Sequence, residues 1–230
     1  MKIDIKKFDF ECDKILAHLN IEERERVMAH SESLSFKKGK LIFYEGGVPT
    51  GAFIIESGRA KIYKTGLDGK EQIFYIYKSG DILGYHALLC DEPYEDACEA
   101  LEDCEISFIS APKFDKLLNE IPKLRFLLIQ NLSHEFGVLV NTITILAQKS
   151  LRERLALYLL ILKQRYNDQS IKLSRSDLSN LIGTSRESMG RLLKEFKEEK
   201  LILINKRNIE ILRDDFLLRI AYGEIIRSQS

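Results

Sequence analysis

The stretch that most restricts the fold is LSRSDLSNLIGTSRESMGRLLKEFKEEKLI, residues 173–202, because it contains two helix-start signals only ten residues apart. A hydroxyl side chain followed three positions later by an acidic residue is typical of a capping box. Ser174 forms such a pair with Asp177, and Thr184 forms a complete one with Glu187. Gly183 permits a sharp exit from the first helix. We therefore expect two short helices joined by a tight turn.

The residues that follow complete this unit. In LILINKRNIEIL, residues 201–212, two β-rich runs flank Lys206 and Arg207, which is typical of a hairpin. Apolar side chains also recur on one face of each expected helix: Leu178, Leu181 and Ile182 on the first, and Met189, Leu192, Leu193 and Phe196 on the second. Two helices, a tight turn and a hairpin together predict a winged helix-turn-helix.

The second helix of such a unit enters the DNA major groove by its amino-terminal end. Arg186, Glu187 and Arg191 lie on its outward face, where arginine can bond guanine and glutamate can accept a hydrogen bond from cytosine. Further candidates for base or phosphate contacts are Thr184, Ser185 and Ser188, and candidates for phosphate contacts that hold the register are Ser174, Arg175, Lys206 and Arg207. The alternative interpretation is a solvated helix with an i,i+4 pair of Glu187 and Arg191.

Charge supports DNA as a local partner. The whole chain carries 35 basic and 35 acidic residues, so a uniformly basic surface is excluded. Between Lys172 and Arg207, however, nine basic residues stand against five acidic ones, an excess of four. The basic character is concentrated at the carboxy-terminal end, where the helix-turn-helix is expected.

A different pattern occupies residues 36–108. Short β-rich runs such as GAFIIE, RAKIYK, EQIFYIYK and CEISFIS are separated by glycine-containing turns. Several short strands at this spacing predict a sandwich or barrel. With the helical segments, the fold class is α+β.

A long helix is expected at about residues 122–148, since Pro122 suits a first helical turn. A narrow apolar stripe, with Glu135 in the seam, is suited to pairing with a second copy of the chain; its members are Leu128, Leu132, Leu139, Ile143 and Leu146. In this interpretation Ile129, Phe136 and Val140 cover the β domain. The alternative is that the stripe itself covers that domain. We expect domains at 1–148 and 149–230, the first including the dimer helix.

Nothing in the sequence indicates export or a membrane. The amino terminus lacks a signal peptide's continuous apolar segment, and no run approaches the length that crosses a bilayer. The four cysteines form no CxxC pair, and we expect them to be reduced thiols in a cytoplasmic protein. The carboxy-terminal DDFLLRIAYGEIIRSQS predicts a short helix with a polar tail, to which we assign no function.

The stretch TSRESMGRLLKEFKEEKLI resembles the recognition-helix motif of the Crp/Fnr family of bacterial transcription regulators, and GDILG resembles that family's effector domain. The resemblance implies a cyclic-nucleotide-binding-like β-roll, that is, a double-stranded β-helix (jelly-roll). It also implies a homodimer through the central helix and an inverted-repeat operator. Arg186, Glu187 and Arg191 match the base-reading positions. The turn LDGKE, residues 67–71, could contact RNA polymerase, although a plain hairpin turn is the favoured interpretation.

The effector pocket departs from the pattern of cyclic-AMP-responsive members. Tyr85 follows Gly84 where the resemblance implies a ribose-binding glutamate, and Tyr94, Glu95 and Asp96 fall where it implies an arginine-serine pair for the phosphate. A carboxylate there repels a phosphate. The adenine-capping hydroxyl pair falls on Leu139 and Val140. We therefore expect cyclic AMP not to bind.

The same residues bear on other sensing chemistries. His86 lies where a haem-based sensor of the family carries a haem ligand, although Gly84 replaces that sensor's cysteine, so haem is a weak alternative. An iron–sulfur cluster would need several cysteines near the amino terminus, and Cys12 is the only one there. Thiol redox sensing through Cys90, Cys98 or Cys104 stays open. A cupin-like metal enzyme, the remote alternative, needs clustered histidines, whereas the four present are scattered: His18, His30, His86 and His134. We expect no enzymatic activity and no metal.

Overall fold

The computed structural model describes residues 4–167 and 169–223, and the chain divides into two compact units. One comprises residues 9–138. The other comprises residues 139–230 together with the first eight residues. The division falls within the long helix α5 (Pro122–Gln148) instead of at its end, so each unit is described by itself below.

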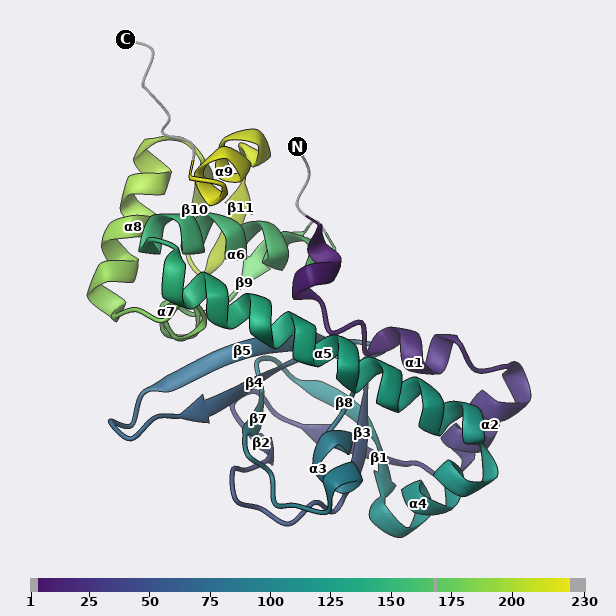
Figure 1. The fold of residues 1–230 in the computed structure, drawn as a ribbon. Coiled ribbons are helices and arrows are strands. Elements are labelled where there is room, and N and C mark those ends of the chain that lie inside the picture. Colours follow the sequence, from purple (N-terminus) through teal and green to yellow (C-terminus); the bar gives the residue numbers. More distant parts are fainter. Residues whose placement is uncertain (1–3, 168, 224–230) are drawn as a thin grey trace. The chain divides into compact units, whose positions relative to one another are not determined.

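Two four-stranded antiparallel sheets form the core of the first unit (Figure 1). The strand order is β1-β8-β3-β6 in one sheet and β2-β7-β4-β5 in the other. The strands are β1 (Glu32–Phe36), β2 (Leu41–Phe43), β3 (Gly51–Ser57), β4 (Arg59–Thr65), β5 (Glu71–Lys78), β6 (Ile82–Leu83), β7 (Ala97–Ala100) and β8 (Cys104–Ser110). All four β-rich runs singled out in the sequence are strands, and the expected β-roll is confirmed.

Both sheets bury branched side chains. Ile55 and Ile106 come from the first sheet and Ile62 and Ile73 from the second, and all four are buried. At Gly51 a Cβ atom would lie 2.2 Å from the carbonyl oxygen of Ile109, so β3 and β8 can approach this closely only because glycine lacks a side chain.

Helices flank this β-roll. They are α1 (Asp13–Ala17), α2 (Ile21–Ala29), α3 (Tyr85–Cys90) and α4 (Ala111–Glu120), followed by the part of α5 up to Val138. The short η1 (Ile5–Phe8) belongs to the other unit. A complete capping box of Asn20 and Glu23 starts α2. Figure 1 shows α1 running beside α5, and the two helices enclose a pocket described below.

The long helix carries apolar residues on two faces. Leu124, Leu128 and Val138 are buried, and Leu128 has no exposed surface at all. The opposite face exposes large apolar side chains, with Phe136 at 70% exposure; its members are Phe126, Ile129, Phe136, Val140 and Ile143. The expectation that Ile129 and Phe136 cover the β domain is therefore wrong, and that for Val140, which lies in the second unit, stays a prediction. Leu128 cannot reach a partner because its own domain encloses it. Leu132, Leu139 and Leu146 are half-buried, and of the predicted stripe Ile143 is exposed.

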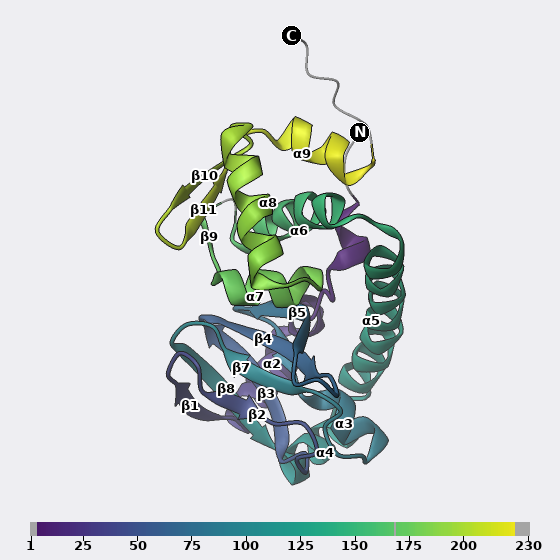
Figure 2. The same ribbon diagram turned by 90° about the vertical axis from the view of Figure 1, so that its left-hand side faces the viewer.

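In the second unit, α5 is followed by α6 (Leu151–Arg165), which starts at a capping box of Ser150 and Glu153. Then follow β9 (Ile171–Lys172), α7 (Arg175–Ile182), α8 (Arg186–Glu198), β10 (Ile202–Asn205), β11 (Asn208–Ile211) and α9 (Asp214–Ala221). The strands form one antiparallel sheet in the order β10-β11-β9, and α9 packs on α6 (Figure 2). The short carboxy-terminal helix is confirmed, and its expected polar tail, residues 224–230, lies outside the described residues. None of the helices described is both long enough and apolar enough to cross a membrane.

Candidate DNA-binding surface and effector site

The second helix of the helix-turn-helix begins one residue later than its sequence signal suggested. Ser185, not Thr184, is the N-cap of α8, and its side chain accepts a hydrogen bond from the backbone N–H of Ser188. The expected capping box of Thr184 and Glu187 is therefore wrong, because the adjacent serine takes the cap position. Ser174 does cap α7 by accepting from the N–H of Asp177, and its hydroxyl donates to the Asp177 carboxylate. Gly183 ends α7 in the left-handed conformation, as its position predicted.

One face of α8 is buried and the other is open. Met189, Leu193 and Phe196 are buried in the core of the second unit, as the apolar spacing predicted. Arg186, Glu187 and Arg191 are exposed, and Ser188 is half-buried. The three candidate reading residues thus share the amino-terminal, solvent-facing part of the helix, the part that enters a major groove.

Hydrogen bonds hold the two arginines of this surface. Arg186 donates from Nε and Nη2 to Oγ of Ser176 in α7, at 3.2 and 2.8 Å, and Arg191 donates from Nη2 to Oγ of Ser188 at 3.0 Å. Glu187 makes no ion pair with Arg191 in the described part of the chain, so the alternative of a self-paired helix face is not formed. Hydrogen bonds from its own backbone N–H and from the Ser185 hydroxyl lower the pKa of Glu187, so its carboxylate is an acceptor at neutral pH.

Contacts from α6 fix the recognition helix in its unit. Arg152 pairs with Glu195 and, at 2.6 Å, with Glu199, and its guanidinium lies over the ring of Phe196. Arg154 donates to the carbonyl oxygen of Ile182 at the end of α7. The reading surface is therefore carried by a rigid framework instead of a loose loop.

The expected hairpin is formed by β10 and β11, with Asn205 paired to Asn208 across the turn. Lys206 and Arg207 are the exposed tip residues, and Lys206 adopts a left-handed conformation. Figure 2 shows the hairpin beside α8. Arg175 is exposed at the start of α7. These positions suit phosphate contacts around the reading helix.

In the β-roll, Tyr85 occupies the interior of the candidate effector site. It follows Gly84, which is left-handed, and it is only 2% exposed. Its hydroxyl donates to Oε1 of Glu135 at 2.6 Å and accepts from Nδ2 of Asn131 at 2.9 Å, and Cys12 Sγ also lies against Glu135. Burial raises the pKa values of Tyr85 and Glu135. Glu135 is thus not a seam residue but the partner of Tyr85 inside the domain.

Three further effector candidates separate in space. Tyr94 is buried, stacks on Phe43 and donates to the carbonyl oxygen of Gly51. Glu95 faces solvent and pairs with Lys64 at 2.7 Å, so its assignment to the pocket is wrong; the chain turns it outward just before β7. Asp96 points the other way, toward His86, with 3.5 Å between Oδ1 and Nε2. Leu139 and Val140 belong to the second unit, and their predicted role stays a prediction.

The surroundings of His86 do not fit haem. Its Nε2 faces the Asp96 carboxylate, and its ring lies edge-on to Tyr94. Neither His86 Nε2 nor Asp96 Oδ1 completes a hydrogen bond within the described residues, because the geometry of the pair is poor. An iron would have to take the place of the carboxylate against this nitrogen.

The cysteines offer no visible thiolate or metal centre. Cys12, Cys98 and Cys104 are buried, and burial raises the pKa values of the Cys98 and Cys104 thiols. Cys90 is exposed. Across residues 4–167 and 169–223, no three His, Cys, Asp or Glu side chains are placed to share a metal ion.

Comparison with known sequences places both units. Residues 33–120 match the sequence model of the cyclic nucleotide-binding domain, and residues 153–220 match that of the Crp-like helix-turn-helix domain. The chain belongs to the Crp/Fnr family of bacterial transcription regulators. It is therefore a DNA-binding transcription regulator and not an enzyme.

Individual relatives agree with this family. The fumarate and nitrate reduction regulatory protein of Vibrio cholerae is 28% identical over 80% of this chain and 76% of its own length. The cyclic AMP receptor protein of Thermus thermophilus is 24% identical over 88% of this chain and 94% of its own. Among solved structures, the c-di-GMP-responsive regulator CLP of Xanthomonas campestris has a TM-score of 0.75 at 21% identity, with coverage of 84% of this chain and 99% of that one. FixK2 of Bradyrhizobium japonicum has a TM-score of 0.73 at 20% identity, covering 83% and 96%.

Sequence reasoning missed two parts of these sites. Ser176 was not named, although a hydroxyl in the first turn of α7 is placed to meet the start of α8. Asn131 was also missed, and Glu135 was placed on the wrong face. Polar residues four apart on an otherwise apolar helix, as Asn131 and Glu135 are, could have indicated a buried polar network.

Proposed function

We propose that this regulator is a homodimer that binds an inverted-repeat operator. The observation that carries the proposal is the exposed face of α5, here called the α5 seam: Phe126, Ile129, Ser133, Phe136, Val140 and Ile143. These positions alternate steps of three and four residues, the spacing of a two-stranded coiled coil. Large apolar residues in a continuous exposed stripe are costly in water and favour pairing.

A second copy seated on the seam supplies the second recognition helix. Two such helices read half-sites one helical turn apart, about 34 Å, so an operator with two-fold symmetry is expected. Arg186, Glu187 and Arg191 read bases, whereas Ser174, Arg175, Lys206 and Arg207 contact phosphates. The hydroxyl residues near the start of the helix can contact either bases or phosphates; they are Thr184, Ser185 and Ser188. A cytoplasmic location belongs to the same proposal. The 67–71 turn is taken as a plain hairpin turn, with contact to RNA polymerase as the alternative.

The effector site favours a regulator that answers neither to cyclic AMP nor to haem. Tyr85 fills the interior of the site and is tied to α5 through Glu135 and Asn131. His86 faces a carboxylate. Added haemin is expected to give no Soret band that shifts with carbon monoxide; a shifting band that disappears in His86→Ala would reverse this.

The deciding experiment selects binding sites from random duplex DNA and measures the mass of the protein in solution. Enrichment of an inverted repeat by a protein of twice the monomer mass supports the proposal. Enrichment of a single, non-repeated site by a monomer contradicts the dimer while leaving DNA binding in place.

A further inference from the structure

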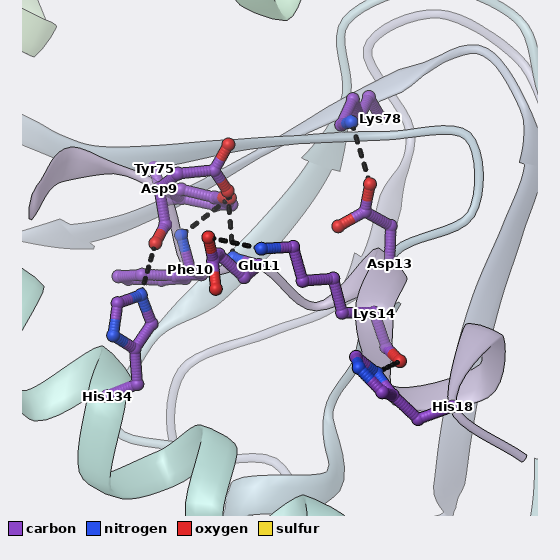
Figure 3. A network of polar contacts seen from close by, with 9 residues as sticks. All are labelled: Asp9, Phe10, Glu11, Asp13, Lys14, His18, Tyr75, Lys78 and His134. Carbon is purple, nitrogen blue, oxygen red and sulfur yellow. Dashed lines mark hydrogen bonds and ion pairs between the residues drawn. The ribbon is translucent and has the colours of Figure 1, made fainter. Parts of the chain in front are cut away.

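A polar pocket lies between α1 and α5, outside the interior site that holds Tyr85. Its volume is about 500 Å³, within the range of small-molecule sites. It is lined by Glu11, Lys14, Ile15 and His18 from the amino-terminal segment and by Leu127, Gln130, Asn131 and His134 from α5. Figure 3 shows His134 and His18 at opposite ends with the Glu11 and Lys14 side chains between them.

The amino-terminal wall of this pocket is anchored to the β-roll. Phe10 stacks on Tyr75 with ring centroids 3.8 Å apart, and the Tyr75 hydroxyl bonds both the Phe10 N–H and the Asp9 carboxylate. Lys78 of β5 pairs with Asp13 at the start of α1 (Figure 3). Both walls are therefore held by the same domain, and the pocket is preformed.

Each of the two imidazoles presents one ring nitrogen without a partner. His18 bonds the carbonyl oxygen of Lys14 through Nδ1 at 2.6 Å, and His134 bonds that of Asp9 through Nε2 at 2.8 Å. Because a carbonyl oxygen only accepts, both of these nitrogens carry the proton. His18 Nε2 and His134 Nδ1 make no hydrogen bond to the residues the structure describes, so each can donate to an anion on protonation.

The fixed charges of the lining cancel, so an anion would be held there by hydrogen-bond donors. Glu11 is its single acidic residue, and Lys14 already neutralises it at 2.6 Å. Lys14 keeps two further N–H groups, and the exposed amide of Gln130 makes no hydrogen bond within the described chain. A metal ion is the weaker occupant, since no three ligating side chains converge anywhere in the described residues.

We propose that this pocket is a binding site for a small polyanion carrying carboxylate or phosphate groups. Lys14 supplies the N–H groups that Glu11 does not accept, the two imidazoles bind groups at either end, and the Gln130 amide is a further donor. The lining residues of α5 span two helical turns, about 10 Å, which suits an elongated ligand with separated negative groups.

Calorimetry of the full chain without DNA tests this site, with sodium pyrophosphate and sodium citrate as probes against chloride at equal ionic strength. We expect at least one probe to bind. Lys14→Gln should weaken that binding about tenfold or more, because a charge-assisted bond is lost. Lys70→Gln is the matched control, since Lys70 forms an equally short pair with Asp68 on an exposed turn far from these lining residues in sequence.

Histidine ring signals in carbon–proton spectra give a second readout. The signals of His18 and His134 should move with the bound probe, whereas that of His30, which bonds the Arg26 carbonyl in the same way but lies outside the pocket, should not. Binding of pyrophosphate alone points to phosphates and of citrate alone to carboxylates. Absence of binding by both probes, or equal weakening in Lys14→Gln and Lys70→Gln, overturns the proposal whatever the DNA experiments give.

Discussion

Arg186 at the start of the recognition helix is held by Ser176 of the preceding helix through two hydrogen bonds from one guanidinium. Holding a long side chain in place before binding removes an ordering cost of about 0.5–1.5 kcal/mol. We expect Ser176→Ala to weaken binding to the selected operator by that amount and to leave binding to scrambled DNA unchanged. Ser176→Thr, which keeps a hydroxyl, is the control in the same binding titrations. Tighter operator binding by Ser176→Ala would instead mean that this bond must break before Arg186 reads a base.

Reading and anchoring residues should differ in their response to sequence and salt. Arg186→Ala is expected to cost about 1–3 kcal/mol on the operator and to relax one base preference. Lys206→Ala, at the hairpin tip, should weaken binding to all sequences and reduce the salt slope by about one. Titrations on operator and scrambled DNA at several salt concentrations measure both. If the two variants behave alike on both DNAs, the division between reading and anchoring residues is wrong.

What the sequence could predict depended on whether the signal was local. The hairpin at Lys206 and the turn at Gly183 are set by neighbouring residues, and both were predicted correctly. The N-cap was misplaced by one residue because Thr184 and Ser185 both carry a capping hydroxyl, and only the backbone decides between them.

The sequence did not predict features that depend on which surface a residue packs against in the folded chain. Helix α5 has an apolar residue at almost every position of two faces, so its periodicity does not say which face meets the β-roll. Leu128 was consequently expected in the dimer interface but is buried in its own domain, and Phe136 was expected to cover the β domain but is exposed. The direction of Glu95 also depended on Lys64 in β4, a residue 31 positions away that pairs with it.

The two faces of α5 can be separated by mutation. Phe136→Asp places a charge in the middle of the proposed seam and should convert the dimer to a folded monomer, measured by sedimentation and circular dichroism. Leu67→Asp, at an exposed apolar residue on the 67–71 turn, is the control. Leu128→Ala should instead lower the free energy of unfolding by about 2–5 kcal/mol, because it opens a cavity in the core. A Phe136→Asp protein that stays dimeric would rule out the seam.

Cyclic AMP should give no heat of binding in calorimetry at submillimolar concentrations. Tyr85 occupies the site interior, and its hydroxyl is already committed to Glu135 and Asn131. The Asp96 carboxylate also faces inward, where it would repel a phosphate. Binding that is present in the wild-type protein and lost on changing Tyr85 would contradict this prediction.

Asp81, in the GDILG stretch, should make stability depend on pH. It has no exposed surface, and burial raises its pKa to about 8. The hydrogen bond from the N–H of Lys78 stabilises the carboxylate and opposes this rise. The folded protein therefore binds a proton that the unfolded chain, with an ordinary pKa of 3.8, has released. Since the folded state holds more protons in this window, stability is highest below pH 4 for this group and falls as pH rises toward 8.

Asp81→Asn removes this titration while keeping an oxygen that can accept from the Lys78 N–H. Urea unfolding of both proteins at several pH values between 5 and 8.5 isolates the contribution of Asp81, because the other groups titrate in both. The free energy of unfolding of the wild type should fall relative to the variant by at most about 1.4 kcal/mol per pH unit, and the difference should level off above about pH 8. A difference that does not change with pH would mean that Asp81 is ionised throughout, stabilised by more than the Lys78 N–H.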